Sequence, residues 1–256
     1  MMEAHVSLQA FTALASLQFR ELALSAYLPA DQGAGHGYYR TLLDDLTRAD
    51  FNNLTDVERS VLRREVPAVL ASLEKRRFDC PAVAVFSCQP SRFARIWRLV
   101  EPLPGRVAVA DLLDLAPMRQ QLLAHPPALA AIVDKHQARL YALVLDELTE
   151  VGHVEGVPIR RHKQGGWSAT ALQRRQDEHA RGNLHEVADA VAGLLERDGY
   201  SRLILAGPPE ARCALKGLLP AGALKLLATE GSIPMYASGN ELAARLRSLD
   251  HQPEPV

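Results

Sequence analysis

The chain has 256 residues, of which 48% are hydrophobic and 23% are charged, and its formal net charge is −1. This composition is typical of a protein with a substantial core, and it excludes a chain that is basic throughout. No apolar run approaches the roughly 18–20 residues that span a bilayer, so no membrane partner is expected. The three cysteines form no CxxC pair, and a reduced, cytoplasmic location is expected.

The first half of the sequence alternates helical and strand patterns. Apolar side chains recur at helical spacing over residues 8–17, and residues 22–28 have the pattern of a buried strand. The capping box at residues 55–58 opens a helix that Pro67 is expected to kink or split. Two more strands, bounded by prolines and glycine, are predicted at residues 82–87 and 106–110.

The prolines that follow His125 interrupt both helix and sheet, so we predict two α/β domains, residues 1–127 and 128–256. After the prolines, two apolar strands flank a polar turn at residues 134–139, and a third strand from Leu148 completes an antiparallel meander.

A long helical region then begins near Thr170. Only its second half has an apolar stripe, so the first half is expected to project from its own domain. The end of the chain is predicted to contain two strands and two helices. They are a strand at residues 202–207, a helix at 208–219, a strand at 224–228, and a helix at 238–249 that opens with a capping box of Ser238 and Glu241.

Residues 160–181 carry a net charge of +4, whereas the rest of the chain has 23 basic and 28 acidic residues. A basic patch on an acidic body attracts phosphate. Gly165 and Gly166 lack a Cβ and can approach another molecule closely, and Trp167 can stack on a base. The alternative interpretation is a solvated loop with a partly buried tryptophan. The candidate phosphate ligands are Arg160, Arg161, Lys163, Arg174, Arg175 and Arg181.

Other motifs predict no further chemistry. The glycines of residues 32–39 lack GxGxxG spacing, which indicates a flexible connection. Because the sequence has no HExxH motif and no compact ligand set, we expect no metal and no cofactor. Asp134 and Asp146 are interpreted as turn formers, not as a catalytic pair. Neutral surface side chains are expected for His162, His179 and His185.

The order of elements from Ala128 onward resembles the central domain of archaeal and eukaryotic class-1 peptide chain release factors. It also resembles the ribosome quality-control peptidyl-tRNA hydrolases and the bacterial branch of this superfamily. The matching pieces are "AAIVDKHQARLYALVL", "RRHKQGG", "SA" at Ser168–Ala169, "LQRRQDEHARGNLHEVADAV" and "LILAG". The resemblance implies a mixed, RNase H-like sheet with helices in the second domain. It also implies a loop that enters the ribosomal A site towards the peptidyl-transferase centre.

Two departures from the family bear on function. The family's catalytic glutamine falls at Trp167. The tryptophan side chain has one N–H donor and no acceptor with which to orient water. The third domain, which in release factors docks a translational GTPase, has no counterpart in the sequence, so no GTPase partner is expected. No Asn-Ile-Lys-Ser stretch is present, and reading of stop codons is therefore not expected.

Three functions follow as hypotheses. The first is a non-hydrolytic factor that binds the ribosome, through its rRNA and tRNA, and occupies, protects or rescues it. The second is a peptidyl-tRNA hydrolase that acts on stalled ribosomes without the glutamine. The third is an α/β module that binds a small molecule or a protein and has no RNA function.

Overall fold

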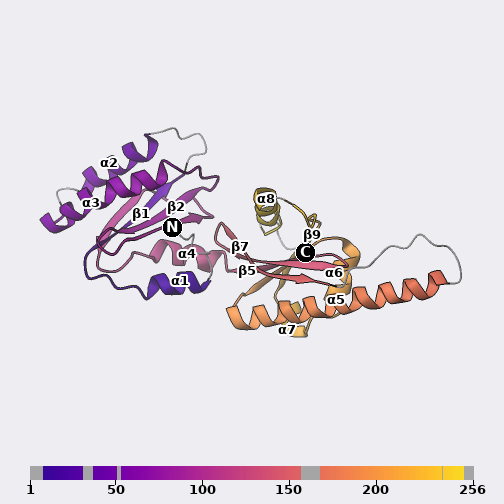
Figure 1. Cartoon of the computed structure of the whole chain (residues 1–256). Coiled ribbons are helices and arrows are strands. Elements are labelled where there is room, and N and C mark those ends of the chain that lie inside the picture. Colours follow the sequence, from indigo (N-terminus) through magenta and orange to yellow (C-terminus); the bar gives the residue numbers. More distant parts are fainter. Residues whose placement is uncertain (1–7, 31–36, 51–52, 157–167, 238, 251–256) are drawn as a thin grey trace. The chain divides into compact units, whose positions relative to one another are not determined.

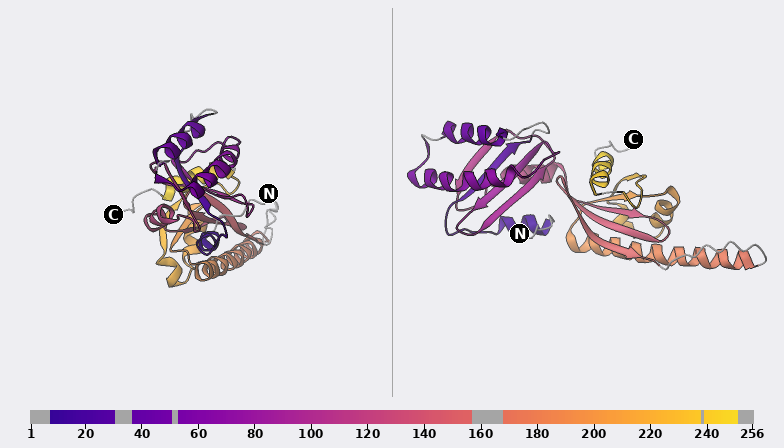
Figure 2. Two further views of the ribbon diagram at one scale, coloured as in Figure 1. Left: turned by 90° about the vertical axis from the view of Figure 1, so that its left-hand side faces the viewer. Right: turned by 45° about the horizontal axis from the view of Figure 1, so that its top comes forward.

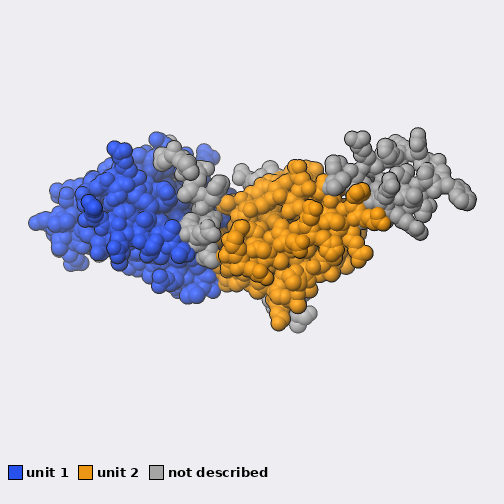
Figure 3. Space-filling view, turned by 60° about the horizontal axis from the view of Figure 1, so that its bottom comes forward, with its two compact units in different colours: residues 1–125, 145–147 blue, residues 126–144, 148–256 orange. Residues whose placement is uncertain are grey.

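The computed structural model describes residues 8–30, 37–50, 53–156, 168–237 and 239–250; for residues 8–10, 50, 168–177 and 239–240 it describes the backbone only. The chain divides into two compact units, coloured separately in Figure 3. Unit 1 comprises residues 1–125 and 145–147, and unit 2 comprises residues 126–144 and 148–256. Both units combine a sheet with helices, which confirms the predicted α/β class.

Unit 1 is built on a four-stranded sheet with the order β3-β2-β1-β4, in which all neighbouring strands are antiparallel. The apolar face of β1 and β2 packs against two helices, α2 and α3, through side chains such as Leu24, Val83 and Leu73. Figure 2 shows these helices on one face of the sheet and α1 on the other. The strands are β1 (Ala23–Pro29), β2 (Ala82–Cys88), β3 (Phe93–Leu99) and β4 (Arg106–Ala110), and the helices are α1 (Leu8–Ala15), α2 (Tyr38–Asp50), α3 (Asp56–Leu73) and α4 (Ala116–Ala124).

Helix α3 begins with the predicted capping box, because Thr55 and Glu58 exchange hydrogen bonds between side chain and backbone. Of the two effects expected of Pro67, a kink or a split, the split does not occur, since α3 continues through Pro67 to Leu73. Pro67 and Arg63 are both exposed, so the carbonyl of Arg63, which loses its N–H partner, remains open to water. The buried side chains on either side of the proline hold the helix against the sheet.

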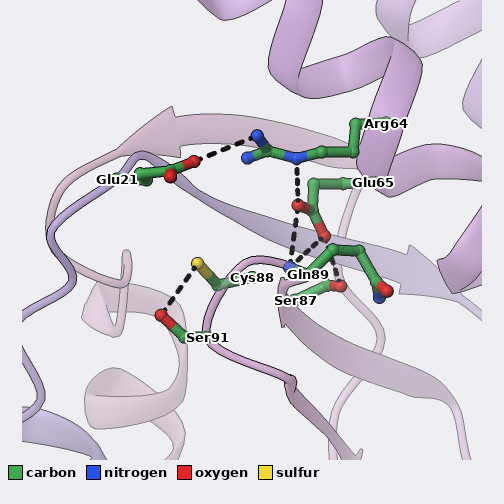
Figure 4. A network of polar contacts seen from close by, with 7 residues as sticks. All are labelled: Glu21, Arg64, Glu65, Ser87, Cys88, Gln89 and Ser91. Carbon is green, nitrogen blue, oxygen red and sulfur yellow. Dashed lines mark hydrogen bonds and ion pairs between the residues drawn. The ribbon is translucent and has the colours of Figure 1, made fainter.

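Glu65 of α3 is a fully buried carboxylate that holds the end of β2 (Figure 4). The Ser87 hydroxyl donates to its Oε2 at 2.7 Å, and the Gln89 backbone N–H donates to its Oε1 at 2.9 Å. On the outer side, Arg64 Nε donates to Oε1 at 2.9 Å, and the Arg64 guanidinium also reaches Glu21 at 3.1 Å. This network fixes the entry to the β2–β3 turn, and we assign it a structural role.

Replacing Glu65 with alanine is expected to destabilise the protein by about 3 kcal/mol, because the buried donors of Ser87 and Gln89 lose a charged acceptor. Urea unfolding measures the change. The matched control is Arg63→Ala, on the exposed face of the same helix, which should stay within about 0.5 kcal/mol of wild type. A loss below about 1 kcal/mol for Glu65→Ala would contradict the role assigned to the network.

Unit 2 is built on a five-stranded mixed sheet with the order β7-β6-β5-β8-β9. Strands β5 and β6 are antiparallel, whereas β8 is parallel to both β5 and β9. The mixed sheet agrees with the predicted fold class, and the first strands form the predicted meander. The strands are β5 (Ala128–Val133), β6 (Gln137–Val144), β7 (Glu147–Glu155), β8 (Arg202–Ala206) and β9 (Leu227–Gly231).

Helices cover both faces of the second sheet (Figure 1). On one face, α5 packs with α6 and α7 over Leu129, Leu140 and Leu205. On the other face, α8 packs through Leu242 and Leu246. The helices are α5 (Ser168–Asp198), α6 (Pro209–Lys216), α7 (Ala221–Leu224) and α8 (Gly239–Asp250).

One predicted strand needs correction, and two other predicted features fall outside the described residues. The strand expected at residues 224–228 is displaced: Leu224 ends α7, and β9 begins at Leu227. Apolar residues continue through both elements, so hydrophobicity alone does not locate the boundary between them. Ser238 lies outside the described residues, and so do residues 31–36 of the glycine-rich connection.

Candidate functional site

Helix α5 is the longest element of the chain, with 31 residues, or about 46 Å at the usual rise per residue. Its second half supplies the predicted apolar stripe, with Leu184, Val187, Val191 and Leu194 buried over the sheet. The backbone from Ser168 to Arg181 precedes the first of these contacts and is about 20 Å long. Figures 1 and 2 show this first half extending past the end of the sheet.

The end of the sheet that α5 crosses is the carboxyl edge of the three parallel strands. Strands β5, β8 and β9 end there at Val133, Ala206 and Gly231, and the Gly207 N–H donates to the Gly231 carbonyl at 3.0 Å. Strand β7 ends at the same edge, because the N–H of Gly156 donates to the His136 carbonyl at 2.7 Å. In open α/β sheets, ligands bind at this edge.

Asn183 ties α5 to this edge, although the sequence pattern gave no reason to expect it. Its side chain is only 4% exposed, and its Nδ2 donates to the Lys135 carbonyl at 3.4 Å. Gly156 lies so close that a Cβ there would be 2.0 Å from Asn183 Cγ. The strand before residues 157–167 and the helix after them are thus joined at one point of the edge.

The β5–β6 turn beside Asn183 is shaped by Asp134, whose Oδ1 accepts from the N–H groups of His136 and Gln137 at 2.6 and 2.9 Å. The interpretation of Asp134 as a turn former is therefore confirmed. Asp146 lies in the turn at the other end of β6, in an ion pair with Arg98 at 3.1 Å, so the two aspartates form no pair.

The same edge carries an exposed aromatic side chain that sequence reasoning missed. Tyr236 is 85% exposed, and its hydroxyl accepts from Gln137 Nε2 at 2.9 Å. Further along the edge, Arg212 and Lys216 of α6 both reach the Glu230 carboxylate, at 2.9 and 2.5 Å. These two cations are neutralised within unit 2. Exposed polar groups without such partners are therefore the better candidates for binding.

The predicted site residues differ in how far the structure describes them. Arg181 lies on α5, and its side chain is exposed. Arg174 and Arg175 lie on the part of α5 whose backbone alone is described. His179 and His185 are exposed on the same helix. The remaining members lie outside the described residues: Arg160, Arg161, His162, Lys163, Gly165, Gly166 and Trp167.

Within the described ranges, no group of three or more His, Cys, Asp or Glu side chains is arranged to hold a metal ion. Among the same residues, none of the helices has the length and apolar character required to cross a membrane. The described edge carries Lys, Arg and Tyr side chains, such as Lys135, Arg181 and Tyr236, which can make electrostatic and aromatic contacts.

The chain is thus a two-unit α/β protein, and its second unit extends a long helix past the carboxyl edge of a mixed sheet. A comparison with protein families matches residues 114–249, more than half of the chain, to bacterial archaeo-eukaryotic release factor family 10. The chain belongs to this family. The assignment agrees with the release-factor resemblance of the sequence and gives the protein a translation-related role.

Solved structures give weaker similarities. The chain is similar to one described as an archaeal protein, with 17% identity over 96% of this chain and 71% of that one, at a TM-score of 0.38. It is also similar to the archaeal translation termination factor aRF1, with 18% identity, 93% and 68% coverage, and a TM-score of 0.35. Pelota of Archaeoglobus fulgidus gives 11% identity, 65% and 45% coverage, and a TM-score of 0.32. A search of the curated proteins gave no match. The family assignment thus depends on the match over residues 114–249.

Proposed function

We propose that this protein is a ribosome-associated factor of the release-factor type that inserts its Gly165–Gly166 segment and the first half of α5 into the ribosomal A site. In this function residues 128–256 act as the RNA-binding domain. The factor occupies, protects or rescues the ribosome and does not hydrolyse peptidyl-tRNA. Its ligands are rRNA and tRNA.

The observation that carries the proposal is the extension of α5 beyond its packed half. A helix that extends about 20 Å beyond its packed half is available to contact a partner outside its own core. Its first residue, Ser168, follows directly on the Gly-Gly-Trp sequence. The amino end of a helix carries roughly half a positive charge, which favours phosphate.

The distribution of charge also favours the first half of α5 and the segment before it as the part that contacts RNA. The segment from Arg160 to Arg181 carries a net charge of +4, and the exposed Arg181 lies where α5 crosses the edge of the sheet. Elsewhere the chain is acidic, so the basic segment is the part that RNA phosphates would attract. Membership of a release-factor family identifies the ribosome as the RNA to test first.

Trp167 supports the non-hydrolytic mode. In the related families, as the resemblance implies, a glutamine at this position helps water attack the ester of peptidyl-tRNA. An indole offers one N–H donor and no acceptor, so it cannot orient the attacking water as an amide can. Tryptophan instead offers a large ring for stacking on a base.

The experiment that tests the proposal is co-sedimentation with purified 70S ribosomes over a series of salt concentrations. Wild type should bind with a steep salt dependence. The double variant Arg174→Ala/Arg175→Ala should lower the slope of log K against log salt by about two units, because each lost phosphate contact removes about one.

The matched control is Arg76→Ala/Arg77→Ala, a pair of adjacent, exposed arginines in unit 1. This control should retain the wild-type slope. Equal salt slopes for all three proteins would show that Arg174 and Arg175 do not contact RNA phosphates. A wild-type protein that does not sediment with ribosomes at low salt would contradict the proposed function itself and favour the α/β module without RNA function.

The peptidyl-tRNA hydrolase hypothesis is separated from the proposal by release of labelled peptide from a stalled ribosome complex. We expect none above the rate without protein. The variant Trp167→Gln restores the Gly-Gly-Gln sequence of the related families. It shows whether the residue at this one position accounts for the absence of peptide release. Release by wild type would establish the enzyme.

A further inference from the structure

The described part of unit 2 has a hollow of about 420 Å³ between α5 and α6, at the carboxyl edge of the sheet. Its buried and half-buried apolar lining, which we call the floor, includes Ala180 and Leu184 of α5 with Ala211 of α6 and Leu218 just beyond it. The exposed charged residues that line it, which we call the rim, are Lys135, Arg181 and Glu210. The volume falls within the roughly 300–1,000 Å³ of small-ligand sites.

The two cations on the rim differ from most others in the unit. Neither Lys135 nor Arg181 has an ion pair with any carboxylate in the part of the chain that the structure describes, and both are exposed. By contrast, most described cations of unit 2 are neutralised by a nearby carboxylate. These paired cations are Arg139, Arg197, Arg202, Arg212, Lys216 and Arg245. Cations left unpaired around an apolar floor suit a ligand that is flat and apolar in one part and anionic in another.

We infer that this hollow binds one unstacked nucleotide of ribosomal RNA, with the base on the floor and its phosphate between Lys135 and Arg181. Glu210 would accept a hydrogen bond from an N–H group on the edge of the base. The inference depends on the proposed function and deepens it, because the hollow lies at the base of the extended half of α5. RNA reached by that half would pass this site.

Cys213 lines the hollow and is exposed, so the reactivity of its thiol reports whether the hollow is occupied. The other two cysteines of the chain, Cys80 and Cys88, are buried. Burial also raises the pKa of the Cys80 thiol to about 11, so this thiol stays protonated and unreactive near neutral pH. A maleimide therefore modifies Cys213 selectively in the folded protein.

The first measurement is the rate of Cys213 modification with and without vacant 70S ribosomes, which contain rRNA and no tRNA. With ribosomes at about ten times Kd, the rate should fall about tenfold, to that of the unbound fraction. The matched control is Cys213→Ala/Leu224→Cys, whose thiol lies in α7, before β9 and hence at the opposite edge of the sheet. Its rate should change much less.

The second measurement identifies the bound group as a phosphate. Lys135→Ala should lower the salt slope of ribosome binding by about one unit. The control is Lys225→Ala, which removes an exposed lysine at the opposite edge of the same sheet and should leave the slope unchanged. Together, protection of Cys213 and the lower slope of Lys135→Ala would support the inference.

Other outcomes would overturn it, and they separate it from the proposed function. Salt-sensitive ribosome binding with Cys213 still reacting at its free rate would leave the proposed function standing and exclude the hollow from the interface. Protection with an unchanged slope in Lys135→Ala would mean that a ribosomal protein fills it. Protection that requires added tRNA would assign the nucleotide to tRNA. If the wild type does not bind ribosomes at all, both proposals fail.

Discussion

Replacing Trp167 with alanine is expected to weaken ribosome binding by about 1–3 kcal/mol, or roughly five- to 150-fold in Kd, because the indole would lose its stacking on a base. Trp167 has the largest side chain of the basic segment and lies between Gly166 and the first residue of α5, so we expect it to contribute strongly to the proposed interface. Co-sedimentation at one fixed salt concentration gives Kd for both proteins. Because no charge is removed, the salt slope should stay the same, unlike that of the arginine variants.

A measurement of stability distinguishes this result from the alternative in which Trp167 is partly buried. If the indole belongs to a core, Trp167→Ala should lower the melting temperature while ribosome affinity per folded molecule stays the same. If it contacts RNA, the melting temperature should stay near that of wild type while the affinity falls. Thermal unfolding of the two proteins at equal concentration decides between these outcomes.

Replacing Gly207 with alanine is expected to destabilise the protein by at least about 3 kcal/mol. Gly207 follows β8 with a φ of +126°, a conformation that L side chains rarely adopt. A Cβ at this position would lie 2.0 Å from the Val133 backbone carbonyl oxygen, which belongs to the neighbouring parallel strand and cannot rotate away. The substitution would therefore push β5 and β8 apart at the edge where α5 is attached.

The matched control for Gly207→Ala is Gly193→Ala, in the interior of α5. A Cβ there would meet no atom within 4 Å, and alanine stabilises a helix interior by about 0.5–1 kcal/mol relative to glycine. Urea unfolding of the two variants should thus give changes of opposite sign. Equal stability of Gly207→Ala and wild type would contradict the close approach of β5 and β8 at this residue.

Local patterns were sufficient to predict much of the fold. The capping box of Thr55 and Glu58 involves residues three apart, and the stripe from Leu184 to Leu195 follows one face of a single helix. The meander of β5 and β6 follows from two apolar runs and the turn that Asp134 forms. In each case the residues that determine the structure are close in the sequence, so their spacing carries the information.

The order of these elements was also enough to indicate the release-factor family, which the family match then established. The Gly165–Gly166–Trp167 residues lie outside the described part of the chain, so their roles remain predictions. The same holds for Arg174 and Arg175, of which the backbone alone is described. Charge and composition identified these residues, and binding experiments are the test of what they contact.

Contacts between residues far apart in the sequence could be found only in the folded chain. Glu65 looks like a surface residue of an amphipathic helix, yet it is buried because Ser87 and Gln89 supply its hydrogen bonds from another element. Asn183 is buried for the same reason, since its partners come from the β5–β6 turn and the end of β7. The hollow bounded by Lys135, Arg181 and Glu210 is lined by three segments that are far apart in the sequence, so residue spacing could not predict it. Side-chain periodicity reports which face of an element is apolar, whereas the partner that covers a polar group is decided by the packing of whole elements.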